Sequence, residues 1–240
     1  MTDAIRFEMK GDVAELCLCA PERRNAIGSQ EISLVKSAID SIPDTCRLFV
    51  IRSEGPVFCA GANLKEISDG TMDGDDFQSM TNAIASLAMP SLAIVEGDVL
   101  GGGAELLVSC DFRLGVTGKY LKIPAAAVGL CYPVEGIQRM TQRLGSTLAR
   151  KLMLTTESVS FEELAQHNAF DWLVPSAEIK AESEAVVQRS RSQECLLLNY
   201  ILSFTIETLA RLGVRCVMTA LPFKRTAPGS QAVSKELPNL

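Results

Sequence analysis

Three consecutive glycines at 101–103 precede Glu105, and this grouping is the part of the chain best suited to chemistry. The glycines lie between a predicted strand at 92–95 and a predicted helix at 104–109, where backbone N–H groups are left free of side chains. Such groups can hold an anion or a developing oxyanion, and Glu105 lies about one helical turn beyond Gly102. A glycine cluster needed only for close packing is the alternative.

A second run of small residues gives the first one a possible partner. The sequence FCAGANLKE at 58–66 follows a predicted buried strand at 48–51 and leads into a helix, which provides a second set of free amides. Small-residue turns at the ends of parallel strands can face one crevice. Two converging N–H donors form an oxyanion hole, in which one donor contributes about 3 to 4 kcal/mol of transition-state stabilisation.

The elements that would position these turns are indicated by hydrophobic periodicity. A hairpin is predicted from residues 5–9 and 13–19, a helix from its candidate cap Ser29 to Pro43, and a buried strand at 47–52. A helix at 75–88 and strands at 92–95 and 112–116 continue an alternation that is typical of parallel pairing by right-handed crossovers. Helical patterns then dominate, at 134–144, 147–154, 161–168, 177–190 and 196–212.

Composition excludes several classes of function. The 23 basic and 29 acidic side chains give a net charge of −6 and provide no basic stripe, so nucleic acids are not expected partners. The apolar runs are far shorter than the roughly 20 residues of a membrane span. No membrane partner is expected either, and with no signal peptide visible we expect a cytoplasmic protein.

Cysteine and histidine usage limits the possible mechanisms. The eight cysteines form no CxxC pair and lie mostly in apolar stretches, as expected for buried thiols. The single histidine, His167, excludes sites that need two imidazoles and is expected at a helix end or on the surface. No metal ligands cluster in the sequence, so we expect a reaction without a metal or a separate cofactor.

Four segments, in order and spacing, resemble the enoyl-CoA hydratase/isomerase (crotonase) superfamily. They are FCAGANLKEI at 58–67, VEGDVLGGGAELLVSCDFRLG at 95–115, IPAAAVGL at 123–130 and GIQRMTQRLGSTLARKLMLT at 136–155, with a weaker match in PERRNAI at 21–27. The resemblance implies an α/β fold with a crotonase-like ββα spiral core at 1–175. It also implies a helical C-terminal oligomerisation region at 176–225, and composition indicates a flexible tail at 226–240.

The resemblance implies a coenzyme A thioester as substrate. Its carbonyl oxygen would lie between the backbone amides of Ala62 and Gly102, which would stabilise an enolate. Coenzyme A would bind the turn with Arg23, Arg24 and Ala26 and the segment with Cys59, Ala60, Gly61 and Lys65. The alternative for each of the three basic side chains is an ordinary solvated cation.

The chain departs from the family at one catalytic position. Hydratases of the family use two glutamates, one in the glycine turn and one directly after a later proline. The first corresponds to Glu105, but the second position holds Ala125, which can neither donate nor accept a proton. The two-acid hydration of the family, and an isomerisation that relies on the second acid, therefore lack a residue here.

Two neighbouring residues could replace the missing acid. Tyr132 and Glu135 lie where several members of the family have auxiliary catalytic groups, and a tyrosine at this turn is similar to that of methylmalonyl-CoA decarboxylase. Tyr132 could instead be a packing aromatic, and Glu135 a first-turn helix residue favoured by the helix dipole.

These observations predict an acyl-CoA lyase that acts by hydration, dehydration or decarboxylation. An enoyl-CoA isomerase and a catalytically silent binder of acyl-CoA or acyl-carrier thioesters are the alternatives. The resemblance also implies homotrimers or dimers of trimers. It places the enzyme in the chemistry of fatty acid metabolism.

Overall fold

The computed structural model describes residues 4–190 of the chain. The predicted helix at 196–212 and the predicted tail at 226–240 lie outside the described residues, as does most of the expected oligomerisation region at 176–225. Residues 4–190 contain two β-sheets and the turns of the candidate site.

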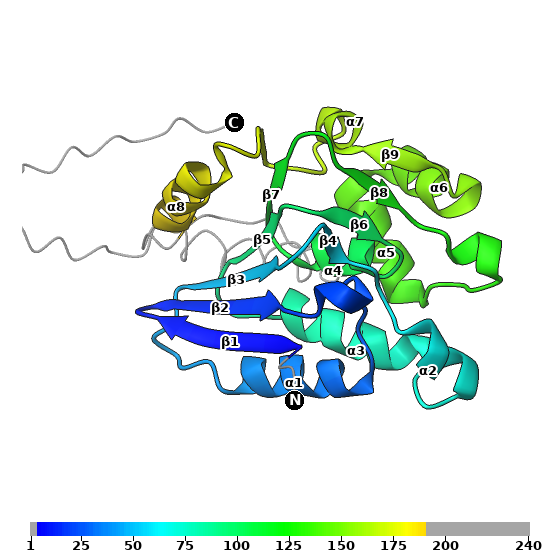
Figure 1. Ribbon diagram of the computed structural model, residues 1–240, viewed down its shortest axis with the longest axis horizontal. Helices are drawn as coiled ribbons and strands as arrows, with labels where there is room; N and C mark the ends of the chain where they lie inside the picture. Colours follow the sequence, from blue (N-terminus) through cyan, green and yellow to red (C-terminus); the bar gives the residue numbers. More distant parts are fainter. Residues whose placement is uncertain (1–3, 191–240) are drawn as a thin grey trace, which may run out of the picture. The chain divides into compact units, whose positions relative to one another are not determined.

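A six-stranded sheet forms the centre of the fold (Figure 1). Its first two strands form an antiparallel hairpin, as predicted, and the other neighbours pair in parallel. In spatial order the strands are β1 (Ile5–Lys10), β2 (Val13–Leu18), β3 (Leu48–Ser53), β5 (Ser91–Val95), β7 (Phe112–Val116) and β10 (Trp172–Val174). The predicted α/β alternation is therefore confirmed for the long strands.

A second, four-stranded sheet was not predicted from the sequence. Its strands have three residues each, which is too short for a periodic hydrophobic pattern. They are β4 (Val57–Cys59), β6 (Asp98–Leu100), β8 (Tyr120–Lys122) and β9 (Ser158–Ser160). The first three pair in parallel and β9 is antiparallel to β8. This small sheet carries the turns of the candidate site.

Helices connect the strands at lengths close to those predicted. They are η1 (Pro21–Arg23), α1 (Ser29–Asp40), α2 (Leu64–Asp69), α3 (Gly74–Ala85), α4 (Gly103–Ser109), η2 (Ala125–Val128), α5 (Val134–Leu144), α6 (Ser146–Thr155), α7 (Phe161–Gln166) and α8 (Ile179–Ser190). His167 is the C-cap of α7 and is exposed, which agrees with the helix-end prediction.

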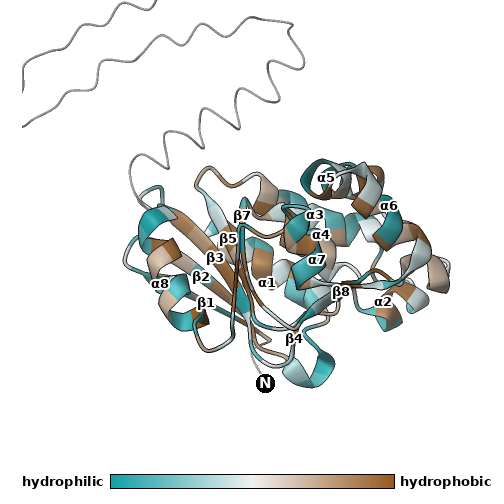
Figure 2. Cartoon of the chain, turned by 90° about the horizontal axis from the view of Figure 1, so that it is seen from above, coloured by the Kyte–Doolittle hydropathy of each residue, from teal (hydrophilic) through white to brown (hydrophobic). Residues whose placement is uncertain are grey.

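The two faces of the large sheet pack against different helices. Successive residues of a strand point to opposite faces, and in β3 Phe49 and Ile51 join the core beneath α1, α3 and α4. Leu48 and Val50 face the other side, where Ile179 and Val186 of α8 cover them. Figure 2 shows hydrophobic residues along these central strands. Both faces are therefore buried, as is usual for parallel sheets.

The start of α1 differs from the prediction. Gly28, and not Ser29, is the N-cap, and its N–H donates to the Glu31 carboxylate at 2.9 Å. Ser29 is the first helical residue, and its N–H and hydroxyl both donate to the Glu66 carboxylate of α2, at 2.8 and 2.7 Å. The side chain of Ser29 therefore links α1 to α2 instead of capping its own helix.

Candidate active site

Three turns of the candidate site come directly after three neighbouring parallel strands. The turn at 60–63 follows β4, the glycines at 101–103 follow β6, and Pro124 with η2 comes after β8. Because parallel strands end at the same edge of a sheet, this arrangement gathers the three turns. The sequence-based expectation that the strands at 48–51 and 92–95 lead into these turns was wrong, since the short strands β4 and β6 intervene.

The first turn is held against the turn at 20–27. Ile27 and Ala62 form a parallel bridge in which the Ile27 N–H donates to the Gly61 carbonyl and the Asn63 N–H donates to the Ile27 carbonyl, both at 2.8 Å. In such a bridge the N–H of Ala62 points to the opposite side. Within residues 4–190 this N–H has no hydrogen-bond partner.

The second turn lies so close to the first that a side chain on Gly61 would have no room. A Cβ atom on Gly61 would lie 2.3 Å from the amide nitrogen of Gly102, and one on Gly102 would lie 3.3 Å from the Cα of Gly61. Gly61 also has a φ of +84°, which favours glycine. Gly102 is the N-cap of α4, and its N–H too has no partner in the described part of the chain. Glycine is therefore required at position 61, because any side chain there would collide with the backbone of Gly102.

Glu105 lies almost completely buried in the first turn of α4, with 1% of its surface exposed. Its carboxylate accepts a hydrogen bond from the Thr81 hydroxyl of α3 at 2.9 Å and one from the Arg139 guanidinium of α5 at 3.3 Å. Arg139 also donates to Thr81, Ser109 and Asn82. Three helices therefore fix the position of this carboxylate.

The groups around Glu105 shift the pKa of its carboxyl in opposite directions. Burial raises the pKa of its carboxyl above the ordinary value, while the Thr81 hydrogen bond and the positive charge of Arg139 oppose that rise. Burial lowers the pKa of Arg139 in turn, and the charges of Glu105 and Glu135 oppose it. A buried carboxyl with a raised pKa is suited to accepting and returning a proton.

One pocket brings the predicted donors and acid together. Its lining includes Ala62, Gly102, Glu105, Ala125 and Tyr132, and its remaining walls are mostly apolar. The cavity measures about 170 Å³. It can therefore hold the reacting end of a small acyl group.

Tyr132 and Glu135, the two predicted substitutes for the missing acid, differ in position. Tyr132 lines the pocket, and its hydroxyl has no hydrogen-bond partner among the described residues. Burial, with the nearby charge of Glu105, raises the pKa of Tyr132, so it remains a neutral proton donor. Glu135 instead accepts hydrogen bonds from the side-chain amides of Gln78 at 2.6 Å and Asn82 at 2.8 Å on α3, and it does not line the pocket.

The residues predicted to bind coenzyme A surround the first turn. Ala60 lines the pocket, and its N–H donates to the Arg24 carbonyl at 2.9 Å, while the N–H of Ala26 donates to the Arg23 carbonyl at 3.1 Å. The side chains of Arg24 and Lys65 are exposed, and Arg23 pairs with Glu31 at 2.9 Å.

Two further residues of this group are buried, one at the end of β4 and one in the first turn. The Cys59 sulfur accepts from the Gly61 N–H at 3.3 Å, and burial raises the pKa of this thiol to about 12. Cys59 and Gly61 therefore shape the turn through buried contacts.

Sequence reasoning did not identify Arg139 and Thr81 as site residues. Both contact Glu105 from helices that are distant in the sequence, with separations of 34 and 24 residues. One signal was present: Gly136 and Arg139 are three residues apart on α5 and therefore lie on one helix face. A Cβ on Gly136 would lie 2.9 Å from the Glu105 carboxyl carbon, so this helix face lies against the carboxylate that Arg139 contacts.

The α/β fold with its glycine turns and buried glutamate defines the class of protein. Residues 8–202 match the family model described as "Enoyl-CoA hydratase/isomerase", and the chain therefore belongs to this family. The crotonase-type fold and membership in that superfamily, both expected from the sequence motifs, are confirmed.

Similar proteins carry related descriptions. The chain is 28% identical over 187 residues to a probable mitochondrial enoyl-CoA hydratase of Arabidopsis thaliana, covering 74% of this chain and 62% of that protein. It is 29% identical over 189 residues to a probable enoyl-CoA hydratase of Mycobacterium bovis, covering 76% and 73%. The match to a probable enoyl-CoA hydratase of Mycobacterium leprae, at 29% identity, covers 58% of this chain and 59% of that protein.

A solved structure with a similar fold carries a related description. A Thermobifida fusca protein of the enoyl-CoA hydratase type, in complex with acetoacetyl-CoA, has a TM-score of 0.77 and 25% identity, covering 88% of this chain and 91% of that one. The same protein has also been solved with CoA. Separately, none of the helices in the described part of the chain is long and apolar enough to cross a membrane.

Proposed function

We propose that this chain is an acyl-CoA lyase that adds water to an enoyl thioester, or removes it, through an enolate. One observation carries the proposal: Ala62 and Gly102, whose backbone amides have no hydrogen-bond partner among the described residues, line the same pocket as the buried Glu105. The acetoacetyl-CoA and CoA complexes of the similar Thermobifida fusca protein support a coenzyme A thioester as the substrate.

The first part of the mechanism is polarisation of the thioester. The carbonyl oxygen accepts hydrogen bonds from the N–H groups of Ala62 and Gly102, and these bonds strengthen as the oxygen gains negative charge. Both donors are main-chain groups fixed by turns, so little reorganisation is needed during the reaction. Arg23, Arg24 and Lys65, around the first turn, are proposed to contact the phosphates of coenzyme A.

The second part uses Glu105 both as base and as acid. Its carboxylate takes a proton from water while the water oxygen bonds to the β-carbon, and the carbon–carbon double bond shifts its electrons into the enolate. The enolate then collapses, and the α-carbon takes the proton back from Glu105, so that one H and one OH have been added. Because Ala125 cannot transfer a proton, the carboxyl of Glu105 performs both proton transfers. Its raised pKa helps it to return the proton to the α-carbon.

The pocket lining favours an uncharged acyl group. Glu105 is the only ionisable acid or base, apart from the thiol and the phenol, among the described residues that line it, and the other walls are largely apolar. A substrate carboxylate would have to enter beside the Glu105 charge without a cation in the lining. This supports hydration or dehydration over reactions of dicarboxylic thioesters.

A decarboxylase is the second candidate, and the Tyr132 hydroxyl favours it. Tyr132 lines the pocket, and its hydroxyl has no hydrogen-bond partner among the described residues and remains protonated. Decarboxylation breaks the bond between the α-carbon and the carboxylate, whose electron pair forms the enolate, and it then needs only a proton for the α-carbon. Tyr132 would supply that proton, and solvent would restore it.

Substrate turnover by the purified chain tests the proposal. Enoyl-CoA thioesters of increasing length should be hydrated, and Glu105→Gln should lower kcat by at least about 100-fold, the usual size of a general acid–base contribution. The matched control is Glu184→Gln, an exposed residue of α8, which should change nothing. Turnover of malonyl-type thioesters that is lost in Tyr132→Phe would select the decarboxylase.

Two other outcomes would contradict the lyase. Conversion of 3-enoyl to 2-enoyl thioesters without hydration would make the chain an isomerase. Thioester binding without any turnover across the panel would make it a silent binder. The proposed assembly into homotrimers or dimers of trimers is tested separately, by the mass of the full chain in solution.

A further inference from the structure

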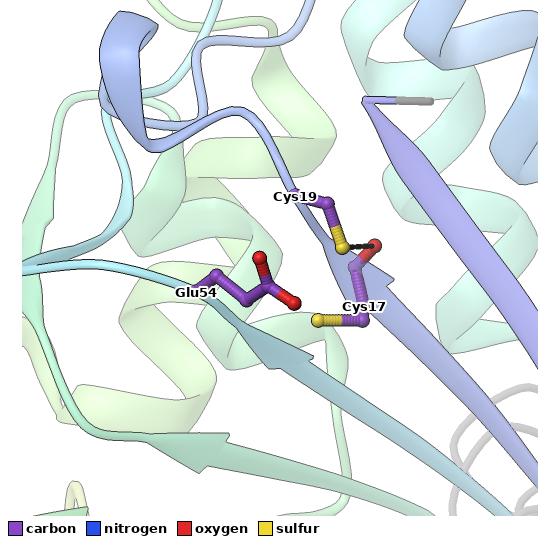
Figure 3. Close-up of side chains that lie close together, drawn as sticks. All are labelled: Cys17, Cys19 and Glu54. Atoms are coloured by element: carbon purple, nitrogen blue, oxygen red, sulfur yellow. Dashed lines mark hydrogen bonds between the residues drawn. The ribbon is translucent and has the colours of Figure 1, made fainter. Parts of the chain in front are cut away.

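A group of three possible metal ligands lies outside the reaction pocket. The Sγ atoms of Cys17 and Cys19 and a carboxylate oxygen of Glu54 all lie within 4.8 Å of one another. Figure 3 shows the Glu54 carboxylate directed toward the two cysteine side chains. None of the three residues lines the pocket that contains Glu105.

The fold brings these residues together through two neighbouring parallel strands. Cys17 lies near the end of β2 and Cys19 just beyond it, and residues two apart on extended backbone point to the same side. Glu54 follows directly after β3, and its N–H donates to the Leu18 carbonyl at 2.9 Å. The Cys19 N–H donates to the Ala4 carbonyl at 2.8 Å. The backbone on both sides of the group is therefore fixed.

The types of donor favour a thiophilic ion. Two sulfur atoms and one carboxylate oxygen match the ligand preferences of Zn²⁺, whose bonds to sulfur are about 2.3 Å and to oxygen about 2.0 to 2.2 Å. Tetrahedral bonds of that length place neighbouring ligands roughly 3.5 to 3.8 Å apart. Cys17 is buried, Cys19 half-buried and Glu54 exposed, so the last two can adjust while solvent supplies a fourth ligand.

The charge balance supports the same ion. Binding releases one proton from each thiol to solvent, and two thiolates with one carboxylate around a divalent cation leave a net charge of −1. The Arg6 guanidinium donates to Oε1 of Glu54 at 2.9 Å, which supplies the compensating positive charge. Its bond involves one carboxylate oxygen and leaves the other for the ion. Such an outer partner also orients the ligand.

We propose that Cys17, Cys19 and Glu54 form a binding site for a thiophilic divalent ion such as Zn²⁺, separate from the reaction pocket. The ion would stabilise the turn at 20–27, which is bonded to the first turn of the candidate site. The Glu54 carbonyl accepts from the buried Asn25 side chain at 2.9 Å, and the same amide group donates to the Val57 carbonyl at 2.8 Å. Fixing Glu54 therefore stabilises the turn at 20–27.

Titration of the reduced, chelator-treated full chain with Co²⁺ and then with Zn²⁺ tests the site. Co²⁺ should give thiolate-to-metal charge-transfer absorption and the strong d–d bands of a tetrahedral site, and Zn²⁺ should abolish both with one ion per chain. Zn²⁺ should also raise the melting temperature, because it binds the folded chain preferentially. Absence of these bands in the unmodified chain would overturn the proposal.

Variants assign the signal to these residues. Changes outside the ligand set already cost 10- to 100-fold in metal affinity, so Cys17→Ser, Cys19→Ser and Glu54→Gln should each weaken binding by at least about tenfold. The control Cys131→Ser removes an exposed thiol elsewhere and should leave the affinity unchanged. Because Cys19 is only half-buried, Cys19→Ser is expected to fold even if Cys17→Ser does not, and it then tests the site by itself. Unchanged affinity in Cys19→Ser, or equal loss in the control, would refute the site.

Discussion

Replacing Gly136 by alanine should displace the Glu105 carboxylate without removing any charged group. Gly136 is buried on α5, and an added Cβ would lie 2.9 Å from the carboxyl carbon and Oε2 of Glu105 and 3.0 Å from Oε1. An ordinary contact needs at least 3.4 Å, so the carboxylate has to move by about half an ångström. Thr81 and Arg139 hold it from other sides and resist that movement.

The expected effects on stability and activity differ in size. Overpacking a buried site costs about 1 to 3 kcal/mol, and the better helix propensity of alanine returns about 1 kcal/mol. The melting temperature should therefore fall by only a few degrees. A misplacement of 1 Å can cost about 100-fold in rate, so half that distance should lower kcat on the best enoyl thioester by about tenfold.

The assay compares kcat, KM and melting temperature with those of a matched variant. Gln138→Ala changes a side chain on the exposed side of the same helix and should leave all three values unchanged. If Gly136→Ala hydrates substrate at the rate of the unmodified chain while remaining folded, the position of the Glu105 carboxylate does not control the chemistry. The proposed mechanism would then be wrong.

Two further predictions test the electrostatics and the turns. Arg139→Met removes the positive charge that opposes the raised pKa of Glu105, so that pKa should rise further. Because the proposed reaction starts from the ionised carboxylate, the acidic limb of the pH dependence of kcat/KM should move to higher pH. An acidic limb that stays at the same pH would show that Arg139 does not influence the titration that controls kcat/KM. Gly61→Ala should abolish activity and lower the melting temperature, because the new Cβ would meet the Gly102 nitrogen at 2.3 Å. The control Gly70→Ala has a similarly positive φ of +74° but open space around the added atom, so equal losses in both variants would assign the effect to backbone strain alone.

The large sheet and most helices could be predicted from the sequence because their signals are local. A glycine turn between alternating residues indicates the hairpin of β1 and β2, and apolar residues at helical spacing indicate α1. The cap of α1 was predicted wrongly because Ser29 is a good N-cap in isolation. Its side chain instead meets Glu66, a contact that no local pattern contains.

The small sheet could not be predicted because its pairing is determined by tertiary structure. Strands of three residues have no measurable period, and each of them depends on neighbours about 20 to 40 residues away. The glycine turns were nevertheless found, since the need for glycine is visible in the sequence itself. Arg139 was missed because only the packing of α5 against α4 shows that it reaches Glu105.

The three strands that precede the site turns limit where this chain can vary. Adding or deleting one residue in β4, β6 or β8 would turn the following segment to the opposite face of the sheet and separate the amides from the acid. New substrate preferences are expected to arise instead from side-chain changes in the apolar walls of the pocket, which leave the strand pairing intact. Such walls include Leu64 and Ile67 of α2, Val128 at the end of η2 and Leu130 after it. The proposed chemistry and the choice of acyl group therefore depend on different residues of one pocket, and the second can change while the first is retained.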